Sequence, residues 1–275
     1  MSSDTTPTPT PTPPGQRAKP KPPMSRLMRL SLRAVDWATD ATRRADGTLN
    51  RLALSVLDPR VPAFSSPCRG VASRDVVLHP PTRLRARLFY PSAAAGGKDE
   101  RSPPPQPLPV IVFFHGGGFA FLSAASAAYD AACRRIARYA SAAVLSVDYR
   151  RAPEHRCPAA YDDGIAALRY LDDPKNHGGG AGAAANFAAP SAAPGVDSPA
   201  FPPVLLAIGG YDPLQDWQRR YAEMLRGKGK DVRVFEYPNA IHAFYVFPAF
   251  DDGRDLMIRI AEFVAESAAG SGGSE

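Results

Sequence analysis

Three stretches of the sequence carry residues that could do acid–base or anion-stabilising chemistry. The first is the apolar run IVFF, followed by His115 and the glycines Gly116 to Gly118. Glycines let a backbone turn sharply and expose its N–H groups, so this turn suits an anion. The other two stretches supply a carboxylate, Asp212, in GGYDPLQDW and an imidazole, His242, in YPNAIHAF. An oxyanion hole is useful only beside a nucleophile, so a nucleophile must also be sought.

The elements that must position these residues follow an alternating pattern of strands and helices. Strands are predicted at 73–79, 84–90, 109–114, 143–148, 204–210 and 231–238. Helices are predicted at about 125–140, from Pro158 to about Leu171, at 212–229 and at 255–267. This alternation favours an α/β fold with a mostly parallel sheet flanked by helices, in which the first two strands form an antiparallel pair.

Asp212 and His242 follow the last two predicted strands, which a single helix joins. Ligand sites in such sheets lie at the carboxyl ends of the strands, and a right-handed crossover would set both residues at the same end. A carboxylate that precedes a histidine in this way fits the orienting acid and the general base of an α/β-hydrolase triad. Two alternatives stay open: His155 as a rival base, and Cys157 as a nucleophile, although Cys157 has no nucleophile elbow around it.

Four motifs together resemble the plant carboxylesterase family, a branch of the hormone-sensitive-lipase-like α/β-hydrolases that includes the gibberellin receptors. The motifs are HGGGF, DYRRAPEHRCPAAYDDG, GGYDPLQDW and YPNAIHAF. They occur in the family's order, and the match runs from about Ser73 to Ser267. The resemblance implies an α/β-hydrolase fold, no cofactor, no metal ion, and a small-molecule ester or hormone-like ligand as the partner.

The resemblance also implies roles for individual residues. Gly116 and Gly117 would offer N–H groups to an oxyanion, within an oxyanion-hole motif that spans His115 to Gly118. His242 would be the general base, and Asp212 would orient it. Taken alone, a glycine after a strand is often only a turn residue, an aspartate is often a helix cap, and a histidine is often a core residue. Here all three types follow strands and occur in the order in which the family carries them.

The catalytic serine of such enzymes is not found. Family members carry it in a G-x-S-x-G elbow between a strand and a helix, and this sequence contains no such motif. The elbow should fall between Leu171 and Val204, where the only serines are Ser191 and Ser198, and neither is in an elbow. We interpret this as an internal deletion, from a skipped exon or a faulty gene model, that removed the elbow strand. The chain is therefore predicted to be inactive as an esterase, with a gap or exposed strand edges in its sheet.

Two functional hypotheses follow from the resemblance. The first is a carboxylester hydrolase by lineage that lacks its nucleophile. The alternative is a non-catalytic protein that binds a hormone-like small molecule, as gibberellin receptors do. The resemblance implies that those receptors lose the histidine at the position of His242, so its presence favours the enzyme lineage.

The chain divides into three predicted regions. Residues 1–23 form a Pro/Thr-rich tail that is predicted to be disordered. Residues 24–66 show helical spacing of apolar residues and are predicted to form an N-terminal helical lid, although a basic amphipathic helix could instead lie on a membrane. Residues 67–270 are predicted to form an incomplete α/β-hydrolase domain, interrupted by a low-complexity seam at 174–200.

Charge and cysteine content limit the partners and the compartment. The net charge is +6, but residues 1–60 hold ten Lys/Arg against five Asp/Glu, so the rest is nearly neutral and no nucleic-acid partner is expected. The tail has no apolar stretch that could act as a membrane span or signal peptide. Three scattered cysteines favour a reducing compartment, so we expect the cytoplasm, with the nucleus as a second location and an organelle-transit tail as an alternative. The substrate and the oligomeric state are not fixed by the sequence.

Overall fold

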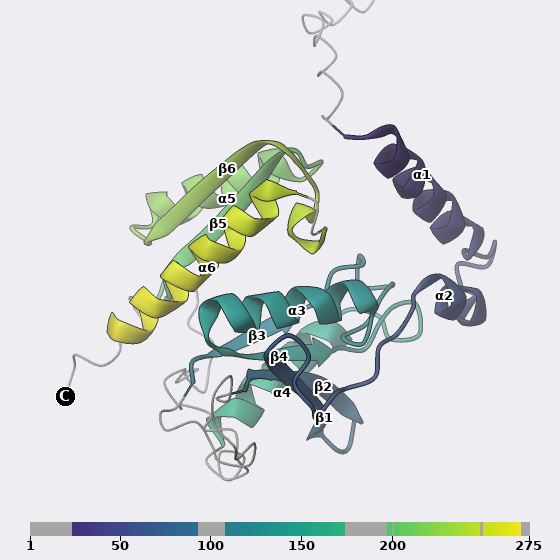
Figure 1. Cartoon of the computed structure of the whole chain (residues 1–275), viewed down its shortest axis with the longest axis horizontal. Coiled ribbons are helices and arrows are strands. Elements are labelled where there is room, and N and C mark those ends of the chain that lie inside the picture. Colours follow the sequence, from purple (N-terminus) through teal and green to yellow (C-terminus); the bar gives the residue numbers. More distant parts are fainter. Residues whose placement is uncertain (1–23, 93–107, 174–196, 200, 248–249, 271–275) are drawn as a thin grey trace, which may run out of the picture.

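The structure, a computed structural model, describes residues 24–92, 108–173, 197–199, 201–247 and 250–270. The predicted disordered tail and most of the predicted low-complexity seam lie outside these residues. Figure 1 shows two strand-and-helix bodies, with the two N-terminal helices beside one of them.

The predicted strands and helices are present, each within a few residues of its expected position. In chain order they are α1 (Arg26–Ala41), α2 (Arg51–Leu57), β1 (Val71–His79), β2 (Leu84–Pro91), β3 (Val110–Phe114), α3 (Ala127–Ala140), β4 (Ala143–Asp148), α4 (Ala159–Asp172), β5 (Val204–Tyr211), α5 (Gln215–Gly227), β6 (Val232–Ile241), the 3-10 helix η2 (Phe244–Val246) and α6 (Asp251–Gly270).

The first body is a four-stranded sheet in the order β1-β2-β4-β3. β1 pairs antiparallel with β2, as predicted, β2 pairs antiparallel with β4, and β3 pairs parallel with β4. Side chains of β4 alternate between two cores: Val144 packs with Cys133 and Ile136 of α3, and Leu145 packs in the core that includes Ala167 of α4. The sheet therefore buries both faces, which explains its nearly continuous apolar strands.

The second body is a parallel pair, β5 and β6, joined by α5. Leu206 faces a core with Leu225 of α5, while Leu205 faces a core with Leu256 of α6. Figure 1 shows α6 lying across this pair and α3 lying between α6 and the first sheet. The α/β organisation predicted from the sequence is confirmed.

The sheet is interrupted, as predicted for an α/β fold that lacks a central strand, but the strand pairings are not mostly parallel. In the described part of the chain the strands form two sheets, and two of the four pairings are antiparallel. The break falls between β3 and β5, because no described strand pairs with the outer edge of either one. Joining the two sheets would require a strand that pairs with β3 on one edge and with β5 on the other. The described residues contain no such strand.

The N-terminal segment contains two helices, α1 and α2, within the region predicted to be helical, but its role as a lid remains a prediction. None of the α1 residues is buried. One side chain, Arg51 of α2, anchors the segment: its guanidinium donates to the carbonyl oxygens of Ala120 at 2.6 Å and Ala152 at 2.7 Å, and to the Glu154 carboxylate at 2.9 Å. No helix among the described residues has the length and apolar character needed to cross a bilayer.

Candidate active site

Asp212 and His242 meet at the carboxyl ends of the parallel strands β5 and β6. The Nδ1 atom of His242 lies 3.0 Å from Oδ2 of Asp212, and the other carboxylate oxygen accepts a hydrogen bond from the backbone N–H of Leu214 at 2.8 Å. The Asp212 side chain is 7% exposed and that of His242 is 60% exposed. A fixed, buried carboxylate therefore holds Nδ1–H, which leaves Nε2 as the nitrogen that can exchange a proton.

Two glycines before Asp212 allow the two strands to approach closely at this end. A Cβ atom on Gly210 would lie 2.2 Å from the carbonyl oxygen of Pro238, and one on Gly209 would lie 2.8 Å from that of Ala240. The register also shifts between Gly209 and Tyr211, which moves the end of β6 relative to β5. The GG pair of GGYD thus lets the β6 backbone reach the level of Asp212.

His115 is a buried packing residue in this structure. It is 3% exposed, its ring stacks on Tyr149 at 4.2 Å between centroids, and the Tyr149 hydroxyl donates to the His115 carbonyl oxygen at 2.7 Å. Its Nδ1 lies 2.9 Å from the carbonyl oxygen of Gly116, and burial lowers the pKa of the imidazole. His115 therefore packs beside the glycine turn, with its ring shielded from solvent.

The three glycines form the sharp turn that the sequence predicts. Gly117 and Gly118 have φ values of +120° and +58°, and a Cβ on Gly117 would lie 2.2 Å from the carbonyl oxygen of Phe121. A Cβ on Gly116 would lie 2.4 Å from the hydroxyl of Tyr129. Burial raises the pKa of Tyr129, and a hydrogen bond between its hydroxyl and the backbone of Gly116 offsets part of that rise. Side chains are excluded here, as an anion-binding turn requires.

A cavity of about 440 Å³ opens where the two sheets are not joined. Its lining contains Phe113 and Gly116 from the first body, and Leu205, Asp212 and His242 from the second. The structure thus brings the acid–base pair and one glycine of the turn to a single apolar space. His115, Gly117 and Gly118 do not line it.

Polar side chains that sequence reasoning missed also line this cavity, among them Tyr129 of α3 and Gln218 of α5. The Oε1 atom of Gln218 is buried without a hydrogen-bond partner among the described residues. Both residues lie on helices that were predicted, but helical periodicity does not show which polar residue faces a ligand. The position of Gln218, six residues after Asp212, was the only signal that could have found it.

The rival candidates do not reach the cavity. His155 and Cys157 are exposed in the loop before α4 and are absent from its lining. Ser198 is half-buried, its carbonyl oxygen accepts from Lys230 Nζ at 2.7 Å, and it also lies outside the lining. Ser191 falls outside the described residues. No group of three or more His, Cys, Asp or Glu side chains in the described ranges is arranged to hold a metal ion.

Comparison with known proteins identifies the family. A family profile described as the α/β hydrolase fold matches residues 111–188 and 177–246. The gibberellin receptor GID1C of Arabidopsis thaliana is 31% identical over 310 residues, covering 82% of this chain and 90% of the receptor. Probable carboxylesterase 2 of the same plant is 35% identical over 142 residues, covering 52% of this chain and 41% of that protein. The chain belongs to the carboxylesterase-like α/β-hydrolase family that contains these gibberellin receptors.

Solved structures support the same fold for this family member. The hyperthermophilic esterase from the archaeon Pyrobaculum calidifontis superposes with a TM-score of 0.59 at 24% identity, covering 90% of this chain and 99% of the esterase. A second esterase, EH1AB1 from the metagenome of Lake Arreo, gives a TM-score of 0.60 at 24% identity. At this identity the likeness concerns the fold, so chemistry must be argued from the residues of the chain itself.

Proposed function

We propose that this chain is a carboxylesterase-lineage scaffold that keeps the acid–base half of a serine hydrolase site and lacks the nucleophile. One observation carries the proposal: the hydrogen-bonded Asp212–His242 pair opens on an apolar cavity whose described lining contains no serine. The chain would bind a small ester-like molecule there without forming an acyl-enzyme. Catalytic and oxyanion-binding roles for Asp212, His242 and Gly116 are part of this proposal.

The absence of the nucleophile is best explained by an internal deletion. The family profile matches in two segments that overlap at residues 177–188, inside the predicted seam. The alignment with GID1C runs over 310 positions although it uses 82% of a 275-residue chain, so it contains gaps on this chain's side. The outer edges of β3 and β5 lack a described partner at the point where an elbow strand would pair.

The residues that remain can do limited chemistry. His242 can accept a proton at Nε2, and the imidazolium so formed is stabilised by Asp212. Without a serine hydroxyl to deprotonate, no tetrahedral intermediate is built on the protein. Serine hydrolases that lose one triad member keep at most roughly 10³–10⁴-fold acceleration over water from the oxyanion hole and binding.

A second candidate function is non-catalytic binding of a hormone-like small molecule. It is favoured by the relatives that cover most of this chain, which are gibberellin receptors, and by the apolar lining of the cavity. The two candidates differ in what they require of His242: an esterase scaffold uses it as a base, whereas a binding protein needs only the cavity. A cytoplasmic location fits both, and the three free cysteines support it.

Turnover of p-nitrophenyl acetate tests the first candidate. The purified chain should hydrolyse this ester no faster than its His242→Ala variant, with His155→Ala as the matched control for an exposed histidine outside the cavity. Turnover that depends on His242 but not on His155 would contradict the proposal. Calorimetric titration with a gibberellin tests the second candidate, because saturable binding that persists in His242→Ala would favour a binding protein over an esterase scaffold.

A further inference from the structure

A second cavity, of about 380 Å³, lies on the opposite face of α3 from the Asp212–His242 cavity. Ala127, Ala131, Arg134 and Arg138 of α3 line it, and their spacing places them on one side of the helix. Tyr129 and Ile136, which line the first cavity, point to the other side. The second cavity is therefore a separate space, and what it binds does not depend on the proposed function.

The lining of the second cavity is strongly basic. It contains the arginines Arg69, Arg134, Arg135 and Arg138 against a single acid, Asp130. That acid is already paired, because Asp130 accepts from Arg134 Nε at 2.7 Å and lies 3.3 Å from the guanidinium of Arg87. The Asp130 carboxylate is thus already paired with Arg134 and Arg87, and it does not neutralise the charges of Arg69 and Arg138.

Among these four arginines, Arg135 has a buried nitrogen without a hydrogen-bond partner in the described part of the chain. Its NH2 group donates to the backbone carbonyl oxygens of Tyr245 and Val246 in η2, and its buried Nε has no partner among the described residues. Burial, together with the nearby charge of Arg138, lowers its pKa. A guanidinium in a partly desolvated site gains more from the charge of a nearby anion than a solvated guanidinium would.

The remaining walls are apolar. Val61 and Phe64 from the segment before β1 and the two alanines of α3 supply them, and the guanidinium of Arg134 lies 5.6 Å from the centre of the Phe64 ring. A bare inorganic ion would leave this surface uncovered, whereas a flat apolar group would cover it. The cavity therefore combines an anion-binding side with an apolar side.

We propose that this second cavity is a binding site for a small organic carboxylate with a flat apolar body. The carboxylate lies among Arg69, Arg135 and Arg138, whose planar forks match its geometry. The apolar body lies against Phe64 and Val61.

Two cysteines give the experiment an internal control. Cys68 lines the second cavity and is exposed, whereas Cys157 is exposed elsewhere, in the loop before α4. The full chain is treated with iodoacetamide with and without 2-naphthoate as the probe, and alkylation at each cysteine is followed by mass spectrometry. The carboxylate should slow alkylation of Cys68 saturably and leave Cys157 unchanged. The neutral analogue 2-naphthamide, which has the same shape, should protect Cys68 far less.

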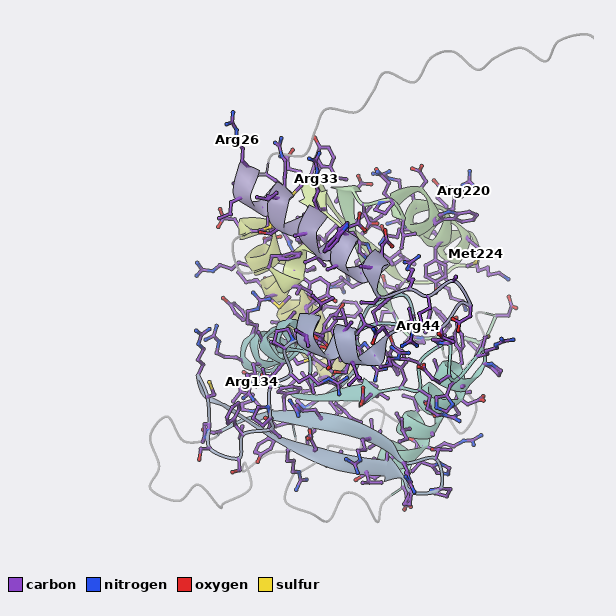
Figure 2. All side chains as sticks on the ribbon, turned by 90° about the vertical axis from the view of Figure 1, so that its right-hand side faces the viewer. Arg26, Arg33, Arg44, Arg134, Arg220 and Met224 are labelled. Carbon is purple, nitrogen blue, oxygen red and sulfur yellow. The ribbon has the colours of Figure 1, made fainter. Side chains whose placement is uncertain are left out.

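The variants separate charge recognition from simple burial. Arg69 and Arg138 are exposed, so Arg69→Gln with Arg138→Gln should leave the fold intact and abolish protection by 2-naphthoate. Arg220→Gln is the control: Figure 2 shows Arg220 on α5, well away from the labelled Arg134. Arg135 is left unchanged because it also holds η2. Equal protection by the amide, protection that survives in the double variant, or no protection of Cys68 at all would each overturn the proposal.

Discussion

The two bodies of this molecule are built from similar parts and buried to different degrees. β4, at the centre of the four-stranded sheet, is buried at five of its six residues. β5, in the two-stranded sheet, is buried at only two of eight residues, although a helix covers each face of its sheet. The difference lies at the edges: β4 pairs with a strand on both sides, and β5 pairs on one side only.

β3 shows the same deficit from the other side of the break. It is buried at one of its five residues, and Phe114 at its end is 46% exposed. The sequence VIVFF is typical of a strand that is buried on both faces in a parallel sheet. β3 and β5 are both apolar in sequence but poorly buried, and they lie on either side of the same gap. The loss of a strand between them would produce this pattern.

The largest expected difference between the bodies concerns their ion pairs. Asp130 sits in the first body with its side chain 6% exposed, between Arg87 and Arg134. Removing it by Asp130→Ala leaves the buried Arg134 guanidinium without a carboxylate, whereas Arg87 keeps its ion pair with Asp75 at 2.7 Å. Leaving one buried charge uncompensated should cost about 3–5 kcal/mol of unfolding free energy. Glu236→Ala in the second body breaks a solvent-exposed pair with Arg219 and should cost at most about 1 kcal/mol.

Urea denaturation of both variants beside the parent chain measures this difference. In the Glu236→Ala variant, Arg219 can keep its hydrogen bond to Gln215, which is 3.0 Å long in the parent chain, and water can solvate the rest of its guanidinium. The variant is therefore a control in which an ion pair is lost without burying an unpaired charge. Similar losses in the two variants would mean that the bodies do not differ in burial as described.

The next difference concerns the strands on either side of the gap. Leu145 of β4 is 2% exposed, and Leu145→Ala should cost about 2–5 kcal/mol, because it removes buried atoms and leaves a cavity. Leu205 of β5 is half-buried and already lines a cavity, so Leu205→Ala should cost less than about 2 kcal/mol. Midpoints of urea unfolding compare the two, and an equal cost would argue that the β5 edge is covered in solution.

The smallest expected effect concerns the anchor of the N-terminal segment. The hydrogen bond from Arg51 lowers the pKa of Glu154 from 4.5 to about 2. The pair therefore contributes stability above pH 4.5, and this contribution is lost as the pH falls from 4.5 towards 2. Because Glu154 is 48% exposed, solvent screening limits the effect to roughly 0.5–1 kcal/mol.

A pH series of unfolding for the parent chain and Glu154→Gln measures that effect. The two chains should differ at pH 7 and converge near pH 2. A difference that stays constant between these values would show that the ionised carboxylate is not what anchors α2.

The strand and helix positions could be predicted because local pattern decides them. Strands such as β4 are short apolar runs between breakers, and α5 joins β5 to β6 by a crossover whose hand is nearly invariant. The sequence predicted that a missing strand would leave a gap or exposed edges in the sheet, but it did not predict which strands would pair. Which strands pair across a sheet depends on edges that are distant in sequence, so the antiparallel pairing of β2 with β4 was not foreseen.

The sequence predicted those site residues whose positions follow from the ends of strands. Asp212 and His242 were predicted as a pair because each follows a parallel strand, and the GG pair before Asp212 lets those strands close up. His115 was grouped with the oxyanion turn, yet it is buried, because one polar residue after a strand does not reveal the direction of its side chain. The arginines of the second cavity were assigned no role from the sequence, because Arg69 and the α3 arginines come together only in the folded chain.

Labelling with a fluorophosphonate most directly tests the central claim, that this chain holds an ordered Asp212–His242 pair without a nucleophile. The reagent forms a covalent bond with an activated serine hydroxyl, so intact protein mass reports the stoichiometry and peptide mapping reports the site. We expect no stoichiometric adduct on the parent chain, and the same result for His242→Ala. A single labelled serine per chain, lost on His242→Ala, would contradict the account, and Ser198 and Ser191 would be the first positions to map.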